Sequence, residues 1–527
     1  MVRAEARRGE RPLAACFGIP PGKRRPYCPL TWFPPVTRDW RELGRAADVL
    51  LREYDVEIRR ATQLMNAGAP SIALACPAGH LTAVARYPAR LGGFSRARRP
   101  PGPRLVDIPP EVGALMEEMA AMVDRLGDAM RGLPLPEVEI EGVRLGPSLR
   151  RLLAAAALQS PELARLLAEV EDRRAALRAR ALEMLAGVKT PPCPHRDPQT
   201  GRACGLETKA VITYNVQIEL LGLQHLAHAA SAMARLDAMI RRTGFDKLMH
   251  LQGVGQSGLA FLFYAAAVNK WPDRPSRLIS YLGIAPVKVC IRCRAVYKGG
   301  VTACPRCGRP TVSTLPSRAA SAWLGGVPLL KRTRAQTRAW VLGQALLAQA
   351  RRGAAPAVMA ALADLAGRHY ARYLDCYNKC GGDPDRMLEE GCAGARLPLL
   401  IKRHPGRAVE FTVSAAVNSA VWELVKIYIN AAVNARNYLD GGKPAEPYSQ
   451  HRRYWPVTVF WRRGGEPPED YVRWHGVDPE DERKLRERLN RRGEELARVY
   501  AERRKGRGEE AWEAWREVLA RALEVRI

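Results

Sequence analysis

The chain has few carboxylates for its size. Its 527 residues include 54 Asp and Glu against 83 Lys and Arg, so the formal net charge is +29 at pH 7. An excess of cations makes polyanions the first partners to consider. Arginine outnumbers lysine and suits bidentate phosphate contacts, although genomic base composition is an alternative source of it. We therefore expect a nucleic-acid partner, with DNA favoured over RNA.

Long apolar runs are missing as well. No stretch is long enough to cross a bilayer, and no apolar segment follows the polar residues from Met1 to Arg11. We expect a cytoplasmic, nucleoid-associated protein with no membrane partner, and homo-oligomerisation stays open. Glutamine is scarce beside Arg, Glu, Ala and Leu, which leaves a thermophilic source open.

Twelve cysteines stand out against these absences, and ten of them fall into three groups. In a reducing compartment they are metal ligands or buried thiols rather than disulfides, except in hyperthermophiles. Two Cys-x-x-Cys knuckles, ten residues apart, predict a zinc ribbon built from Cys290, Cys293, Cys304 and Cys307. All four positions are filled by thiols, so the site is structural rather than catalytic; free or redox thiols are the alternative.

Basic residues surround these knuckles. Pro305 and Gly308 suit the tight turn of the second knuckle, where backbone N–H groups point at sulfur. We expect the cations of the ribbon to face phosphates: Arg292, Lys298, Arg306 and Arg309.

A second metal site is split along the sequence. Cys76 and His80 would form one half, and Cys193 and Cys204 the other, with His195 as a competing ligand. The intervening helices would then be an insertion in a split ribbon. The alternative is that these thiols are unrelated.

A third group contains Cys376, Cys380 and Cys392. The first two lie one helical turn apart, which allows a shared metal or a redox pair. Buried structural cysteines are the interpretation that we favour for this group.

A Gly-x-Gly turn lies between two helical segments. Gly253 and Gly255 would let the turn approach a phosphate, and the N–H groups of the following helix favour an anion there. This pattern indicates a helix-hairpin-helix element that contacts DNA. A simple helical turn is the alternative.

The same segment resembles a known transposase family. Gly253 to Ala260, followed by Ser276 to Pro286 with its Leu-Gly-Ile-Ala-Pro ending, is similar to the C-terminal half of certain insertion-sequence recombinases. Those proteins have a RuvC-like N-terminal domain and a serine-bearing C-terminal domain, and some are guided by a bridging RNA. The resemblance covers roughly Leu220 to Tyr438, with the ribbon and a later loop as interruptions.

The resemblance implies particular site residues. The family's serine nucleophile corresponds by position to Ser321, which lacks the usual following glycine. Its basic helix start and a later basic segment correspond to Lys331, Arg332, Arg334, Arg338, Lys402 and Arg403. The acidic tetrad of the N-terminal domain is not found. Asp39, Asp48, Glu53 and Asp55 lie on or near one helix, where a solvated face is the ordinary interpretation, so Mg²⁺ would enter only through an unrecognised nuclease site.

Three hypotheses follow. The first is a transposase-related, DNA-binding protein of a mobile element, with structural zinc and without catalysis. The second is an active DNA recombinase using a serine near Ser321, with a guide RNA implied by the resemblance. The third is a zinc-stapled scaffold subunit of a nucleoprotein complex.

The fold class that we expect is mainly α with small β zinc ribbons, in several domains. Periodicity predicts long helices over 40–65, 111–132, 160–185, 212–242, 332–350, 356–376 and 409–439, and hairpins over 71–87 and 138–145. Alternating charges from Asp478 onward predict helix with a solvated or partner-binding face. The expected segments are 1–105 (basic, with half of the split ribbon), 106–190 (helical insertion), 191–245 (second half and long helix), 246–287 (helix-hairpin-helix), 288–315 (zinc ribbon), 316–440 (transposase-like helices) and 441–527 (charged helices).

Overall fold

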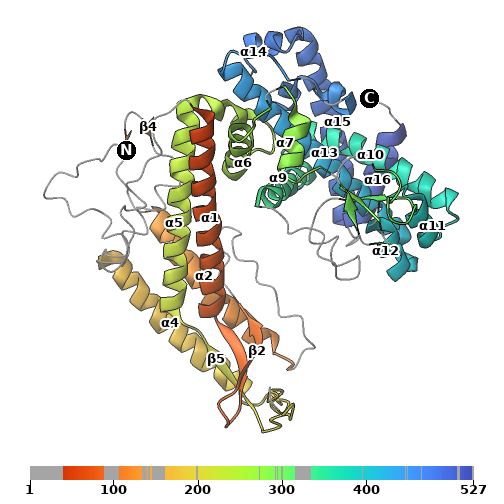
Figure 1. The fold of residues 1–527 in the computed structure, drawn as a ribbon. Coiled ribbons are helices and arrows are strands. Elements are labelled where there is room, and N and C mark those ends of the chain that lie inside the picture. Colours follow the sequence, from red (N-terminus) through yellow and green to blue (C-terminus); the bar gives the residue numbers. More distant parts are fainter. Residues whose placement is uncertain are drawn as a thin grey trace. The chain divides into compact units, whose positions relative to one another are not determined.

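The computed structural model describes most of the chain from residue 39 onward. The described ranges are 39–87, 106–132, 139–140, 143–144, 161–197, 200–271, 273–285, 287–290, 292–293, 295–297, 301–314, 334–394, 396–445, 447, 449–464, 466–506 and 511–524. Within these ranges the fold is mainly helical, with three small antiparallel sheets (Figure 1). None of the described helices is long and apolar enough to span a membrane.

The chain divides into two compact units. The first comprises Met1–Val36 and Asp48–Met239, and the second comprises Thr37–Ala47 and Ile240–Ile527. Helices α1 and α5 contribute residues to both units. We describe each unit by itself.

The first unit combines long helices with a small sheet. Its elements are α1 (Trp40–Gly68), β1 (Ser71–Ala75), β2 (Leu81–Arg86), α2 (Pro110–Gly132), β3 (Glu139–Ile140), β4 (Val143–Arg144), α4 (Pro161–Leu185), β5 (Lys209–Thr213) and α5 (Val216–Thr243). The expected helices over 40–65, 111–132 and 160–185 and both expected hairpins are present. The expected helix start at Ile212 is wrong, because Ile212 lies in β5 and pairs with Ile72.

Helices α1 and α5 lie side by side and antiparallel (Figure 1). Gly222 of α5 faces Met65 near the end of α1: a Cβ at this glycine would lie 2.7 Å from the methionine sulfur. Further along, Glu57 of α1 pairs with His225 of α5 at 2.5 Å. Glu57 is only 6 % exposed and therefore does not belong to a solvated face of α1. Of the carboxylates for which a solvated face was expected, Glu53 pairs with Arg235 of α5 at 2.8 Å.

The sheet of this unit has the strand order β2-β1-β5, with both pairings antiparallel. One face packs on α2 and α4, where Ile72 and Ile212 meet Met116. Beside it, Arg174 of α4 is fully buried and pairs with Glu219 of α5 at 2.5 Å, and it also donates to the backbone oxygen of Met119 in α2. This buried ion pair joins three helices around the sheet.

The second unit is a helical assembly with one ribbon. Its elements are η4 (Phe245–His250), α6 (Gln256–Ala267), α7 (Pro275–Tyr281), β6 (Val287–Val289), β7 (Val296–Tyr297), β8 (Val312–Thr314), α9 (Arg334–Arg351), α10 (Pro356–Lys379), α11 (Pro384–Glu390), α12 (Arg396–Arg403), η5 (Pro405–Arg407), α13 (Ala408–Leu439), η6 (Ser449–Tyr454), η7 (Val457–Phe460), α14 (Glu469–Trp474), α15 (Pro479–Gly506) and α16 (Ala511–Glu524).

Helix α10 is the centre of this unit. Its first turns, Ala357 to Ala363, are buried all round, as expected for a helix with an apolar sequence on every face. It packs against α13, α15, α16 and α9. Gly493 of α15 permits a close approach to α10, because a Cβ there would lie 1.7 Å from the backbone oxygen of Pro356.

The charged C-terminal helices are present as expected, and most charged side chains of α15 are exposed. The opposite side of α15 packs against α10 and α16. Leu489, Leu496 and Tyr500 form its buried stripe, and Trp515 of α16 is buried beside Tyr500. The charges surround a narrow apolar stripe, which the alternation concealed.

Candidate metal centres

The ribbon in the second unit brings together all four cysteines predicted for it. The sulfurs of Cys290, Cys293, Cys304 and Cys307 lie within 4.8 Å of one another. Those of Cys290 and Cys307 are 3.5 Å apart. Thiolates bound at about 2.3 Å around a tetrahedral ion such as zinc would lie about 3.8 Å from each other. The spacing of the four sulfurs therefore fits one metal ion.

Both knuckles have the turn geometry that ligation needs. The backbone N–H of Cys293 donates to the sulfur of Cys290 over 3.4 Å. In the second knuckle, Gly308 has a φ of +70° and donates to the backbone oxygen of Cys304. Strand β6 lies between β7 and β8, and Cys290 follows it directly. The sheet thus holds the first knuckle beside the second.

The thiols of this ribbon influence one another's ionisation. The hydroxyl of Tyr297 lies 3.1 Å from the sulfur of Cys304 and lowers the pKa of that thiol to about 6. Cys307 and the other neighbouring sulfurs raise the pKa of Cys293 to about 12. Four thiols so close together oppose full ionisation, and a divalent cation would remove that opposition. The donor set fits a soft or borderline metal ion.

The first unit holds the second cluster. Cys76, His80, Cys193 and Cys204 also place their ligand atoms within 4.8 Å of one another. The sulfur of Cys76 lies 3.5 Å from Nδ1 of His80 and 4.0 Å from the sulfur of Cys204. The structure thus brings together two halves that lie more than a hundred residues apart in the sequence.

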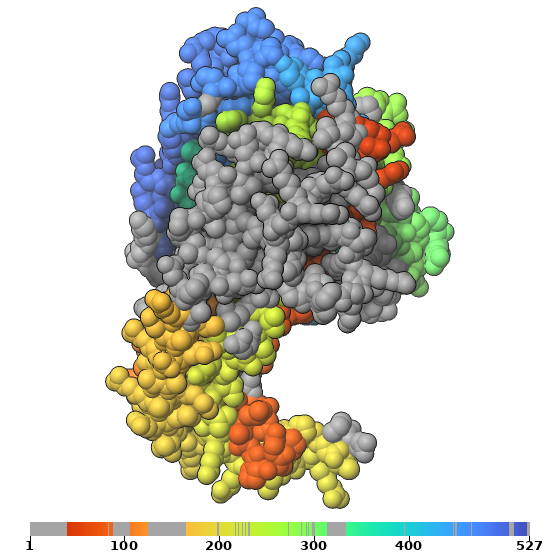
Figure 2. Space-filling model, turned by 90° about the vertical axis from the view of Figure 1, so that its left-hand side faces the viewer, coloured from red at the N-terminus to blue at the C-terminus, as the bar shows by residue number. Residues whose placement is uncertain are grey.

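Strand pairing explains how the halves meet. Strand β1 leads into Cys76 and pairs with β2, which follows His80, while β5 follows Cys204 and pairs with the other edge of β1. In Figure 2 the orange atoms of the β1–β2 hairpin lie against yellow atoms from the chain near residue 200. Helices α2 and α4 pack on each other between these halves in the sequence, as expected for an insertion in a split ribbon.

His195 lies beside this second cluster. Its ring stacks on that of His80 with the centroids 3.9 Å apart. The four-ligand group contains His80 and not His195. The structure therefore assigns His195 a place against a ligand rather than within the set.

The third cysteine group agrees in part with the interpretation favoured above, because Cys376 and Cys380 are buried. Cys376 and Cys392 are joined in a disulfide, and Cys380 is buried beside them. The expectation of metal ligands or buried thiols rather than disulfides is therefore wrong at the pair Cys376 and Cys392.

Three of the predicted phosphate-binding cations of the ribbon, Arg292, Arg306 and Arg309, are exposed, and one of them has a carboxylate partner. Arg292 and Arg306 lie one on each knuckle. Arg309 lies 3.8 Å from Glu389 of α11, whose carboxylate offsets its charge. Lys298 lies outside the described residues.

The predicted cations of the helices differ in their exposure and in their partners. Lys402 pairs with Asp385 of α11 at 2.8 Å. Arg334 and Arg403 are exposed, and Arg338 is half-buried. The candidate nucleophile Ser321 lies outside the described residues, together with Lys331 and Arg332.

The two glycines of the Gly-x-Gly turn have different surroundings. Gly253 has a φ of +79° and is buried, and a Cβ there would lie 2.4 Å from Cδ2 of Leu346. The expectation that Gly253 approaches a phosphate is wrong, because this residue packs against α9. Gly255 is exposed at the start of α6, with open space where a Cβ would point. The preceding Gln252 fixes the turn, since its side chain accepts from the N–H of Ala357 and donates to Asn490.

Comparison with known proteins adds no relative. No protein-family model, no curated protein and no solved structure matches this chain.

Proposed function

We propose that this protein binds nucleic acid, DNA in preference to RNA, and that two structural zinc ions hold its ribbons in shape. The observation that carries the proposal is the ribbon of the second unit, with its four converging cysteines and its exposed Arg292 and Arg306. A net charge of +29 supports a polyanionic partner. The resemblance in the segment around Gly255 supports a relation to transposases of mobile elements.

Zinc suits both donor sets better than other common ions. One set contains four cysteines and the other three cysteines and a histidine, which are the usual ligands of structural zinc. Hard cations such as Mg²⁺ prefer oxygen ligands and do not fit these groups. With every ligand position filled, each ion would stabilise its sheet and leave no place for a reacting water. We therefore propose binding without a catalytic step at these centres.

Direct binding measurements test the proposal. Fluorescence anisotropy with labelled duplex DNA, single-stranded DNA and RNA of one sequence gives the affinities at several salt concentrations. Contacts with phosphates release counterions, so affinity should fall by orders of magnitude between about 50 and 200 mM salt. An affinity that does not change with salt, or no binding to any of the three, would overturn the proposal.

A charge-removal variant locates the interface. We expect Arg292→Ala combined with Arg306→Ala to weaken binding and to lower the salt slope by about one for each phosphate that the variant no longer binds. Arg483→Ala is the matched control, because this exposed arginine of α15 is paired with Glu480. Equal effects of the ribbon variant and the control would remove the ribbon from the interface. Metal analysis should find two zinc ions per chain.

A further inference from the structure

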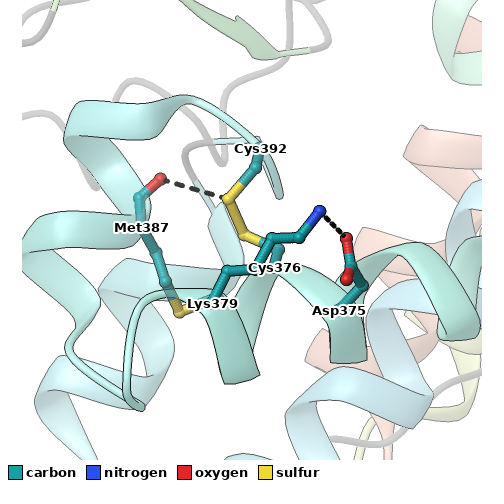
Figure 3. The surroundings of a disulfide bond; sticks show 5 residues. All are labelled: Asp375, Cys376, Lys379, Met387 and Cys392. Atoms are coloured by element: carbon teal, nitrogen blue, oxygen red, sulfur yellow. Dashed lines mark hydrogen bonds and ion pairs between the residues drawn. A yellow bond between two sulfur atoms is a disulfide. The ribbon is translucent and has the colours of Figure 1, made fainter.

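Three cysteines gather at the end of α10. Cys376 lies in the last turns of this helix, Cys380 caps it, and Cys392 follows α11. Their sulfurs all lie within 4.8 Å of one another, and Cys376 and Cys392 form a disulfide (Figure 3). We propose that the three cysteines are a thiol–disulfide exchange site for small thiols and small disulfides. The oxidation state of this site controls how firmly the Cys290 ribbon is held against α11 and α12. This inference does not depend on nucleic-acid binding.

The surroundings favour a disulfide over a metal ion at this site. Cys376 and Cys380 belong to an apolar cluster with Met387, Leu397 and Ile401. A disulfide is neutral and suits such an environment. Three thiolates around a divalent ion would leave a net negative charge among apolar side chains, which is costly without a compensating cation. Lys379, beside the disulfide in Figure 3, is paired with Asp375 at 2.7 Å.

The three sulfurs differ in access. Cys392 is half-buried, whereas Cys376 and Cys380 are each 2 % exposed. A small dithiol therefore attacks the sulfur of Cys392. The S–S bond breaks, and the electron pair leaves on Cys376, which takes up a proton. The second thiol of the reagent then displaces Cys392, so the dithiol is oxidised to its disulfide and the protein gains two thiols. A small disulfide, such as oxidised glutathione, reverses the reaction.

Cys380 offers a second pairing without any reagent. Its thiolate attacks the sulfur of Cys392, a Cys380–Cys392 bond forms, and Cys376 leaves and takes the proton that Cys380 lost. No electrons are gained or lost overall. The pair Cys376 and Cys380 is disfavoured, since residues four apart on a helix hold their Cβ atoms about 5–6 Å apart, whereas a disulfide needs about 3.5–4.5 Å. Cys392 can thus be bound to either of two positions on α10.

The ribbon packs against the segment around Cys392, from α11 to α12. A Cβ at Gly391 would lie 3.3 Å from the backbone oxygen of Thr311 in the ribbon. Val312 of β8 packs against Leu388 of α11 and Leu399 of α12. The disulfide at Cys392 is therefore a covalent cross-link between this segment and α10, in addition to the main chain. When it opens, the segment is held only by the main chain through residues 380–383 and by non-covalent contacts.

Disulfide mapping tests the exchange site. The full zinc-loaded chain is equilibrated in buffers of reduced and oxidised glutathione, alkylated and analysed by mass spectrometry. We expect Cys376–Cys392 and Cys380–Cys392 peptides in the wild type, and only the former in Cys380→Ser. Absence of the Cys380–Cys392 peptide would overturn the exchange. A third zinc ion per reduced chain that Cys380→Ser loses would also overturn the proposal, in favour of a metal site.

Hydrogen exchange tests the coupling to the ribbon. In the oxidised and the reduced wild type we compare amide exchange over residues 301–314, with zinc content verified in both states. We expect exchange there to quicken at least several-fold on reduction, and Cys392→Ser to behave like the reduced chain. Residues 71–86 of the other sheet serve as the internal control. Equal exchange of residues 301–314 in the two oxidation states would overturn the coupling.

Discussion

A single hydroxyl within the ribbon shows how much a residue outside the ligand set can contribute. Tyr297 lies 3.1 Å from the sulfur of Cys304 and favours its thiolate. Partners that orient and ionise metal ligands are worth about 10- to 100-fold in metal affinity. We expect Tyr297→Phe to lose zinc to a chromogenic chelator at about one-tenth of the concentration that strips the wild type. Tyr281→Phe, at an exposed tyrosine of α7, is the control. Unchanged competition in Tyr297→Phe would show that this contact is incidental.

At the scale of single residues, the sequence predicted the candidate metal ligands and missed the residues that contact them. Cys290 and Cys293 are recognisable because a knuckle is a local pattern whose spacing is set by one turn. The contact of Tyr297 with Cys304 depends on the register of β7 against β6, which no spacing reveals. His195 illustrates the same limit, since only the fold separates it from the ligand His80.

A buried histidine gives the second unit a pH dependence. His475 is 8 % exposed, and burial lowers its pKa to about 4, although its Nδ1 contacts the backbone oxygen of Tyr471. As pH falls from the ordinary value of 6.5 towards 4, the unfolded chain takes up a proton before the folded one does. The stability contributed by neutral His475 is therefore complete above pH 6.5 and is lost towards pH 4.

Urea denaturation of the second unit, followed by tryptophan fluorescence, measures this dependence. We expect the urea concentration at the midpoint to decrease when the pH is lowered from 7 to 5. The decrease should be smaller in His475→Gln. Zinc content is checked at each pH so that metal loss is not mistaken for this effect. An identical pH profile in wild type and variant would contradict the assignment.

Among the elements, the buried pair of Arg174 and Glu219 ties α2, α4 and α5 together. Removing one partner leaves an uncompensated charge, which typically costs about 3–5 kcal/mol. We expect Arg174→Met to destabilise α4 and to speed native-state hydrogen exchange over residues 165–185. Adding Glu219→Leu removes the orphaned carboxylate and should restore most of the protection. A double variant no better than the single one would show that the pair itself, rather than the orphaned charge, provides the stability.

The two glycines of the Gly-x-Gly turn form a matched pair. At Gly253 a Cβ meets Leu346 and φ is +79°, so Gly253→Ala should destabilise the second unit by about 1–3 kcal/mol. At Gly255 the space is open and φ is −102°, so Gly255→Ala should change stability by less than about 0.5 kcal/mol. Thermal unfolding of both variants measures this difference. Lower DNA affinity in Gly255→Ala alone would locate a phosphate at this turn.

Periodicity predicted the long helices well. It predicted poorly those strands whose pairing partners lie far away in the sequence. The helix over 409–439 was predicted almost to its ends, because α13 carries a local pattern of apolar residues. Ile212 was assigned to a helix, since the strand that pairs with it lies about 140 residues earlier and contributes nothing local. The stripe around Leu489 and Leu496 was hidden by the charges that flank it.

At the scale of the whole molecule, we expect bound metal to contribute more to the stability of the small sheets than to that of the long helices. The strands that carry the two clusters are two to six residues long, and sheets of this size are marginal without another constraint. Because the binding free energy of a structural metal is also folding free energy, each sheet should depend on its own ion. The long helices have extensive apolar packing and do not share that dependence.

Metal removal separates these contributions. With both ions chelated, we expect hydrogen exchange to quicken over residues 71–86 and 209–213 in one unit and over 287–314 in the other, while helical circular dichroism changes little. Cys76→Ser should lose one zinc and loosen only the first set, and Cys290→Ser only the second. DNA affinity should fall in Cys290→Ser, because that ribbon carries Arg292 and Arg306. Two zinc ions retained in either variant, or loosening of both sheets by one substitution, would show that the clusters are not independent metal sites.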